Sequence, residues 1–175
     1  MNIRYIEIKD EKLLAVGGAI AFINNKINID LREAAMKRAN ESELSKMKEL
    51  YGEILQMEED EAAILFHPKL RDMLEEPEFK AVMLHEEGHI VLGHLLSPET
   101  EEMVECEGIQ VINNEDYELQ ADSYAVSVVG PTTMKRALIK ISKKIAKENV
   151  FSVKHLYNSM KPRFMAFTDY KSSAK

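Results

Sequence analysis

The feature that most constrains this chain is the sequence HEEGH at residues 85–89, which interrupts an apolar stretch running from Ala81 to Leu92. Residues four apart lie on one face of a helix, so His85 and His89 can present two imidazoles to one ion while Glu86 flanks them. Burying such groups among apolar neighbours costs several kcal/mol, to order of magnitude, unless they are paired. The fold must therefore build a partner for them, and a metal ion satisfies that need.

A second motif, ELQAD at residues 118–122, begins 29 residues after His89 and is also predicted to be helical. Catalytic zinc takes three protein ligands and keeps one position open, and His/His/Glu is a known ligand set. Glu118 is the expected third ligand. Asp122 lies one turn further along the same face, where its carboxylate could accept the spare N–H of a ligating histidine.

Small residues accompany both motifs. Gly88 costs about 1 kcal/mol in a helix relative to alanine, which suggests that another segment packs hard against the helix there. Ala121 keeps the face of the second helix small. We therefore expect the two helices to approach closely, with the segment of Glu118 packed against Gly88.

Three other interpretations of the histidines stay open at this stage. The pair could be satisfied by Glu118 and Asp122 without metal, or zinc could be purely structural, although structural sites usually have four ligands and favour Cys. His94 could serve as a ligand, but its spacing is one residue short of HExxHxxGxxH and its Gly-His order is wrong for that motif. We expect His94 to flank the site.

The two motifs together resemble a known group of enzymes. HEEGH and ELQAD, continued by Ser123-Tyr124-Ala125, Gly130 and Ala137-Leu138, resemble the HExxH … ExxADxxA pattern of gluzincins related to the CAAX prenyl protease and HtpX endopeptidases. The stretch HEEGHIVLGH is also similar to the active helix of ImmA/IrrE-like metallopeptidases, which more often have Asn at the position of Asp122. The resemblance covers roughly residues 79–145 and leaves the first sixty residues unassigned.

The resemblance implies an α+β, zincin-like fold: a small, mostly antiparallel N-terminal sheet packed with an active-site helix, followed by a helical C-terminal part. It implies a zinc-dependent endopeptidase in which His85, His89 and Glu118 bind Zn²⁺. Glu86 would be the general base and Asp122 would support a ligating histidine. The expected partner is a protein or peptide substrate.

Two alternatives share these residues. One is a regulatory metallopeptidase of the ImmA/IrrE sort that cleaves a single repressor partner. The other is a metal-binding interaction protein without turnover. Substituting Glu86 distinguishes the second, because it should abolish turnover and leave metal and partner binding intact.

Length and composition limit the remaining classes. At 175 residues the chain is expected to form one domain, residues 1–167, followed by a mobile tail at 168–175. It has no apolar run near 18 residues and no signal-peptide pattern, and Cys106, its only cysteine, excludes an intramolecular disulfide. We expect a soluble, cytoplasmic protein. No phosphate-binding glycine loop or nucleic-acid motif is present.

The charge is divided along the chain. Residues 135–175 carry 11 basic and 2 acidic side chains, or +9, which leaves −16 of the total of −7 for the first 134 residues. One hypothesis is that the acidic segment 97–116 or the basic segment after Met134 packs over the cleft and restrains activity. The alternative is that both are merely solvated. Cys106 lies in the acidic segment, where an inert thiol is favoured over an inhibitory zinc thiolate.

The N-terminal part is predicted to be mixed. Two apolar runs joined by Asn24-Asn25 favour a β-hairpin, and Gly17-Gly18 is the alternative position for a turn. Asp30 is a helix-start signal, and from there to about Met57 the pattern is helical, with a second cap near Asn40 that would divide it into two helices.

The central and C-terminal elements follow from breakers and spacing. The apolar run 62–66 is predicted to be a strand, with His67 as a capping or surface residue. In zincins generally the strand nearest the zinc helix is an open sheet edge that receives substrate, and residues 64–66 are the expected edge. A helix begins near Pro77, segment 97–116 is a loop or small hairpin, and helices follow on both sides of Gly130-Pro131. A final short helix is expected to end at Pro162. Tyr124 and His155 are candidate hydrogen-bond donors to the oxyanion, and the sequence favours neither.

Overall fold

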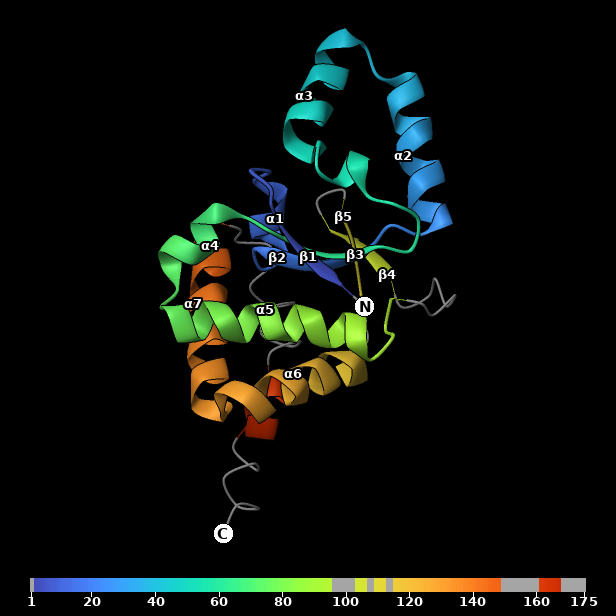
Figure 1. The fold of residues 1–175 in the computed structure, drawn as a ribbon. Coiled ribbons are helices and arrows are strands. Elements are labelled where there is room, and N and C mark those ends of the chain that lie inside the picture. The colour runs from blue at the N-terminus through green and yellow to red at the C-terminus, as the bar shows by residue number, and fades with distance from the viewer. Residues whose placement is uncertain (1, 96–102, 107–108, 113–114, 149–160, 168–175) are drawn as a thin grey trace.

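A computed structural model describes residues 2–95, 103–106, 109–112, 115–148 and 161–167. It confirms an α+β chain that is mostly helical (Figure 1). The strands are β1 (Ile3–Glu7), β2 (Ala19–Ile23), β3 (Ala62–Phe66), β4 (Met103–Cys106) and β5 (Ile109–Ile112). The helices are α1 (Lys12–Ala15), α2 (Lys26–Arg38), α3 (Glu41–Tyr51), the 3₁₀ turn η1 (Ile54–Gln56), α4 (Pro68–Met73), α5 (Glu76–Val91), α6 (Glu115–Val129) and α7 (Pro131–Glu148), and residues 161–167 are also helical.

The main sheet has the order β1-β3-β2, with β3 in the centre. β3 pairs with β1 in parallel and with β2 antiparallel, so that Ala21 lies opposite Ile64. The sheet is therefore mixed, and the expectation of a mostly antiparallel sheet is wrong. The expectation that Ile64–Phe66 forms the open edge is wrong as well: the strand is correct, but all five residues of β3 are buried. A continuous apolar run is typical of a strand covered on both faces, and its short length gave no sign of its place in the sheet.

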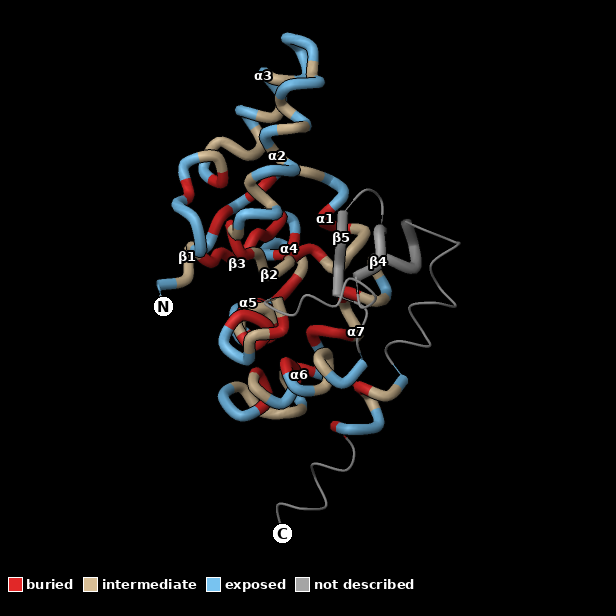
Figure 2. Tube along the Cα trace, turned by 90° about the vertical axis from the view of Figure 1, so that its right-hand side faces the viewer, coloured by how far each residue is buried: buried red, intermediate tan, exposed pale blue. Residues whose placement is uncertain are grey.

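Helices cover both faces of this sheet. On one face α5 contacts β2, β3, α6 and α7, and the larger core cluster lies there, including Ile64 and Phe66. On the other face Ala63 and Leu65 pack with α1 and the η1 turn. Figure 2 shows the buried residues concentrated along β3 and the helices below it. α5 buries the face that carries Phe79 and Val82 between the sheet and these two helices, whereas Glu76 and Lys80 are exposed.

Asparagines 24 and 25 do not form the predicted hairpin turn. Asn25 is the N-cap of α2, and its side-chain oxygen accepts a hydrogen bond from the backbone N–H of Asn28 at 2.9 Å. Asn24 is fully buried and donates to the carbonyls of Met57 and Glu58, both at 2.8 Å. Asparagine serves equally well in turns and in caps, so the dipeptide alone could not decide between them.

The predicted helical region after Asp30 is two helices, as the second cap suggested. Asn40 and Glu43 form a reciprocal capping box at the start of α3. Asp30 lies inside α2 and is not its cap. Neither helix contains a fully buried residue, and the pair projects from the sheet (Figures 1 and 2).

The C-terminal helices largely follow the pattern. Gly130, at φ +80°, separates α6 from α7, and Pro131 begins α7. β4 and β5 form the small antiparallel hairpin that was one of the two structures predicted for that region. Pro162 lies within the helical residues 161–167, and the helix predicted to end at it falls outside the described residues. The segment 150–160 and the tail 168–175 lie outside the described residues.

Among the described residues, none of the helices combines the length and apolarity that crossing a membrane requires.

Candidate metal centre

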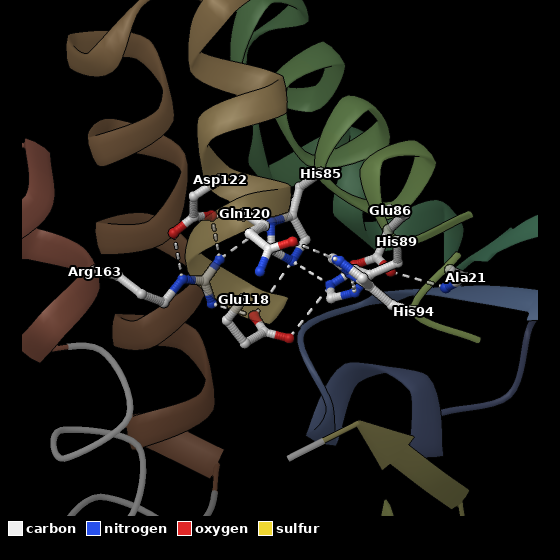
Figure 3. A network of polar contacts seen from close by, with 9 residues as sticks. All are labelled: Ala21, His85, Glu86, His89, His94, Glu118, Gln120, Asp122 and Arg163. Carbon is white, nitrogen blue, oxygen red and sulfur yellow. Dashed lines mark hydrogen bonds and ion pairs between the residues drawn. The ribbon is translucent and has the colours of Figure 1, made fainter. Parts of the chain in front are cut away.

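Two neighbouring helices bring three ligand atoms together. α5 supplies His85 and His89, whose Nε2 atoms are 3.2 Å apart. α6 supplies Glu118, whose two carboxylate oxygens lie 3.3 Å from the Nε2 atoms of His85 and His89 respectively (Figure 3). In the described part of the chain, His85, His89 and Glu118 form a group whose ligand atoms are close enough to hold one metal ion. The sequence motifs, 29 residues apart, are thus brought to one point.

The spacing of the ligand atoms fits zinc. With Zn–N distances of 2.0–2.1 Å, adjacent ligand atoms of a tetrahedral site are about 3.3 Å apart. The two Nε2 atoms are 3.2 Å apart, each lies 3.3 Å from a different oxygen of Glu118, and one ligand atom from each of the three residues lies within 4.8 Å of the others. The side chains of His85 and His89 are 7% and 4% exposed, whereas that of Glu118 is 26% exposed, so the cluster opens on the Glu118 side. Three ligands and one open side are typical of a catalytic zinc site.

The close approach of the two helices depends on Gly88. A Cβ at this position would lie 3.1 Å from the Cα of Ala121 and 3.3 Å from the Cβ of Tyr124. Ala121 is itself fully buried. The expectation that the segment of Glu118 packs against Gly88 is therefore confirmed, and the absence of a side chain there sets the distance between the helices.

Asp122 and a distant arginine support the cluster from behind. Asp122 Oδ1 lies 2.9 Å from His85 Nδ1, the contact predicted from the sequence. Arg163, from the helical residues 161–167, donates two hydrogen bonds to the Asp122 carboxylate, at 2.7 and 2.6 Å. It also lies 3.0 Å from Glu118. One guanidinium thus holds two acidic side chains of α6 in a fixed orientation.

The electrostatics of the cluster follow from these pairs. Burial alone would lower the pKa of His85, but the Glu118 and Asp122 carboxylates overcome it and raise that pKa to about 10 in the absence of metal. Burial alone would raise the pKa of Glu118 and Asp122, but Arg163 and His85 hold both below their ordinary values, that of Glu118 well below. The site therefore concentrates anionic charge around two imidazoles, an arrangement that favours a cation.

Glu86 occupies the other side of the histidines and faces β2. Its Oε2 accepts a hydrogen bond from the backbone N–H of Ala21 at 2.8 Å (Figure 3). Burial raises the pKa of Glu86, and the nearby His85 and His89 oppose that shift only partly. This carboxylate is thus more basic than an exposed glutamate and is tied to the strand at the sheet edge.

His94 is near the cluster but is not among its convergent ligand atoms. Its Nδ1 lies 3.0 Å from Nδ1 of His89, on the opposite side of the His89 ring from Glu118, and its Nε2 lies 3.3 Å from Gln120 Oε1. The ring is 6% exposed and stacks on Tyr117, with centroids 4.2 Å apart. Burial lowers the pKa of His94, which keeps the ring neutral.

The other residues singled out in the sequence lie elsewhere. Tyr124 donates a hydrogen bond of 2.6 Å to Glu87, so its hydroxyl is directed away from the histidines. His67 is the N-cap of α4, as predicted, with Nδ1 accepting from the N–H of Lys69. His155, the side chain of Cys106 and most of the acidic segment lie outside the described residues, so the gating hypothesis is not tested.

Arg163 is the functional residue that sequence reasoning missed. It lies 41 residues beyond Asp122, in a segment that was expected to be the end of the domain. No spacing rule joins an arginine in one helix to a carboxylate in another. The one available signal was general, since buried Asp and Glu require a cationic partner.

Comparison with protein-family models found no match, and comparisons with curated proteins and with solved structures found none either. The case for a function therefore rests on the geometry of His85, Glu86, His89 and Glu118.

Proposed function

We propose that this protein is a zinc-dependent endopeptidase. The observation that carries the proposal is the convergence of the Nε2 atoms of His85 and His89, 3.2 Å apart, on the Glu118 carboxylate at 3.3 Å, with a partly buried carboxylate, Glu86, beside them. A metal site that served structure alone would not require a basic carboxylate beside it. The proposed fold is zincin-like, and the proposed substrate is a peptide or protein segment.

Zinc, when bound, acidifies water and polarises a carbonyl group. The protein's own part is the transfer of protons. Glu86 would take a proton from the attacking water and return it to the leaving amine. Its raised pKa suits this role, because a base is most effective when its pKa lies near the working pH. The hydrogen bond from Ala21 N–H fixes one carboxylate oxygen and leaves the other to exchange the proton.

The edge strand β2 is the natural place for a substrate backbone. Asn24 N–H donates to Glu61 and Gly18 C=O accepts from His67, so alternate residues of this segment pair with the β3 side. Ala21, out of phase with them, turns its N–H away from β3 and toward Glu86. An extended peptide added along that outer edge would lie beside the catalytic carboxylate. β2 replaces residues 64–66 as the proposed substrate-binding edge.

The metal is tested first. Purified wild-type protein should contain one zinc per chain by elemental analysis, and Glu118→Ala should lose most of it. Zinc affinity should fall in mild acid, because the imidazoles must be neutral to bind. Undiminished zinc in Glu118→Ala, combined with loss in His94→Ala, would transfer the third-ligand role to His94.

Turnover is tested with a matched pair of substitutions in the same motif. Glu86→Gln should retain zinc and fold but lose cleavage of a peptide library by about 100-fold or more, because the amide cannot accept a proton. Glu87→Gln is the control. Glu87 bonds to Tyr5 and Tyr124 and does not touch the histidines, so its substitution should leave cleavage unchanged. Near wild-type cleavage by Glu86→Gln would remove Glu86 as the base. A wild type that binds zinc and cleaves nothing would favour a metal-binding protein without turnover.

A further inference from the structure

The end of α5 places a third histidine against the back of a proposed ligand. Leu92 N–H donates to Gly88 C=O, Gly93 N–H donates to Ile90, and His94 N–H donates to His89 C=O at 3.0 Å. Gly93 has φ +77°. The last two of these bonds, together with the left-handed Gly93, form a Schellman motif. In this motif the residue after the glycine characteristically contacts the residue five positions before it. Here those two residues are His94 and His89.

The hydrogen bonds of His94 determine where the ring protons lie. Its Nε2 faces Gln120 Oε1 at 3.3 Å. A carbonyl oxygen accepts only, so Nε2 of His94 carries the proton, and in the neutral ring Nδ1 is then bare. That bare Nδ1 lies 3.0 Å from His89 Nδ1, which must therefore be the donor. The proton of His89 is placed on Nδ1, and its Nε2 lone pair faces the metal centre.

A parallel constraint acts on His85. Asp122 accepts from its Nδ1, so the neutral, metal-binding form of His85 has its lone pair on Nε2. In that form the two Nε2 lone pairs face the Glu118 carboxylate, whereas in the metal-free protein the charged His85 directs an Nε2–H toward Glu118. The two ligands are held by different partners: His85 by a carboxylate, and His89 by a histidine and an amide (Figure 3).

We propose that His94 and Gln120 are positioning residues for the metal centre, which hold His89 in the tautomer and orientation that bind zinc. The hydrogen bonds that join Gln120, His94 and His89 form a relay. Tyr117 fixes the plane of the His94 ring in this relay, because it stacks on His94 with an interplanar angle of 2°. The proposal rests on the proposed function in that it takes His89 to be a zinc ligand.

The reverse proton arrangement makes a contrary prediction. If His94 donated from Nδ1 to His89, the His89 proton would lie on Nε2 and point toward Glu118, 3.3 Å away. The cluster would then be closed by hydrogen bonds. In that arrangement the Gln120 amide would turn by 180°, so that its NH₂ group donates to the bare Nε2 of His94.

The first test uses substitutions of Gln120, which is exposed and outside the ligand set. Gln120→Leu removes the acceptor and should weaken the binding of Zn²⁺, measured by competition with a chelator, by about tenfold or more. Gln120→Glu keeps an acceptor and should retain or increase the affinity. Gln56→Leu, the same change at an exposed glutamine in η1, is the control and should have no effect. Equal affinity in Gln120→Leu and wild type would overturn the proposal.

A spectroscopic measurement tests the relay without turnover and without metal. Ring ¹⁵N shifts of the metal-free protein should show the His94 proton on Nε2 and the His89 proton on Nδ1; the opposite assignment would overturn the proposal. With cobalt in place of zinc, Gln120→Leu should alter the ligand-field spectrum, whereas Gln56→Leu should not. If wild type binds neither metal, the proposed function fails, while the proton assignment still decides the relay.

Discussion

The substitution Gly88→Ala isolates the distance between the two ligand helices. The added Cβ would lie 3.1 Å from the Cα of Ala121, a backbone atom that no rotamer change can move. Ordinary carbon contacts begin at about 3.5 Å, so α6 must retreat by about 0.5 Å. Glu118 lies on α6 one turn before Ala121 and must move with it. Metal sites tolerate ligand displacements of only about 0.2 Å.

The expected free-energy changes for Gly88→Ala distinguish an effect on zinc binding from an effect on folding. Alanine gains about 1 kcal/mol of helix propensity over glycine, and overpacking costs about 1–3 kcal/mol. Metal-free Gly88→Ala should therefore be destabilised by only about 0–2 kcal/mol. Zinc affinity should fall by about tenfold or more, which reduces the stabilisation by excess zinc by about 1.4 kcal/mol for each factor of ten.

Urea unfolding with and without zinc, together with chelator competition, measures both quantities. Ser123→Thr is the matched control, because it adds one carbon at an exposed position of α6, the helix that Gly88→Ala is expected to displace. It should leave zinc affinity unchanged. Wild-type zinc affinity in Gly88→Ala would show that α6 can yield without moving Glu118, and the reasoning from helix spacing would be refuted.

Two further predictions concern the charges around the cluster. Arg163→Met leaves the buried Asp122 and the partly buried Glu118 without their guanidinium and should destabilise the metal-free protein by about 3–5 kcal/mol in urea unfolding. Arg38→Met, at an exposed position of α2, should stay within about 0.5 kcal/mol, and an equal effect of both would contradict the role of Arg163. The raised pKa of His85, about 10 against an ordinary 6.5, stabilises the metal-free fold fully below pH 6.5, and this contribution is lost as pH rises through 10. Unfolding free energies of the metal-free protein should therefore fall across that window, and saturating zinc, which requires neutral imidazole, should remove the slope. A metal-free protein of constant stability from pH 6.5 to 10 would rule out the charged form of His85.

The sequence by itself determined the local parts of the site. The four-residue spacing of His85 and His89 places both on one face of any helix, and a 3.6-residue period needs no tertiary information. Gly88 predicted a close helix contact because a glycine costs about 1 kcal/mol in a helix relative to alanine, and Ala121 supplied a small partner for it. The capping box at Asn40 was equally readable, since both of its partners lie within one turn.

Only the tertiary structure decided the arrangement of the sheet. A buried five-residue strand has the same composition wherever two faces are covered, so its residues could not show that β3 is central and that β2 is the edge. Tertiary packing also decided that Asn25 caps α2 and does not form a turn. Both outcomes depend on which segments pack together, and that information is spread over the whole chain.

The support of the metal centre divides in the same way. The Gly93-His94 pair lies within one turn of His89, so that contact follows from local rules of helix termination. Arg163 reaches Asp122 from 41 residues away, and Gln120 meets His94 across two helices. Hydrogen bonds between distant segments depend on how helices dock, and docking is fixed by the packing of α5 between the sheet, α6 and α7. The proposed ligand residues and their neighbours Asp122 and His94 could therefore be identified in the sequence, whereas the contacts that Arg163 and Gln120 make with them were decided by the fold.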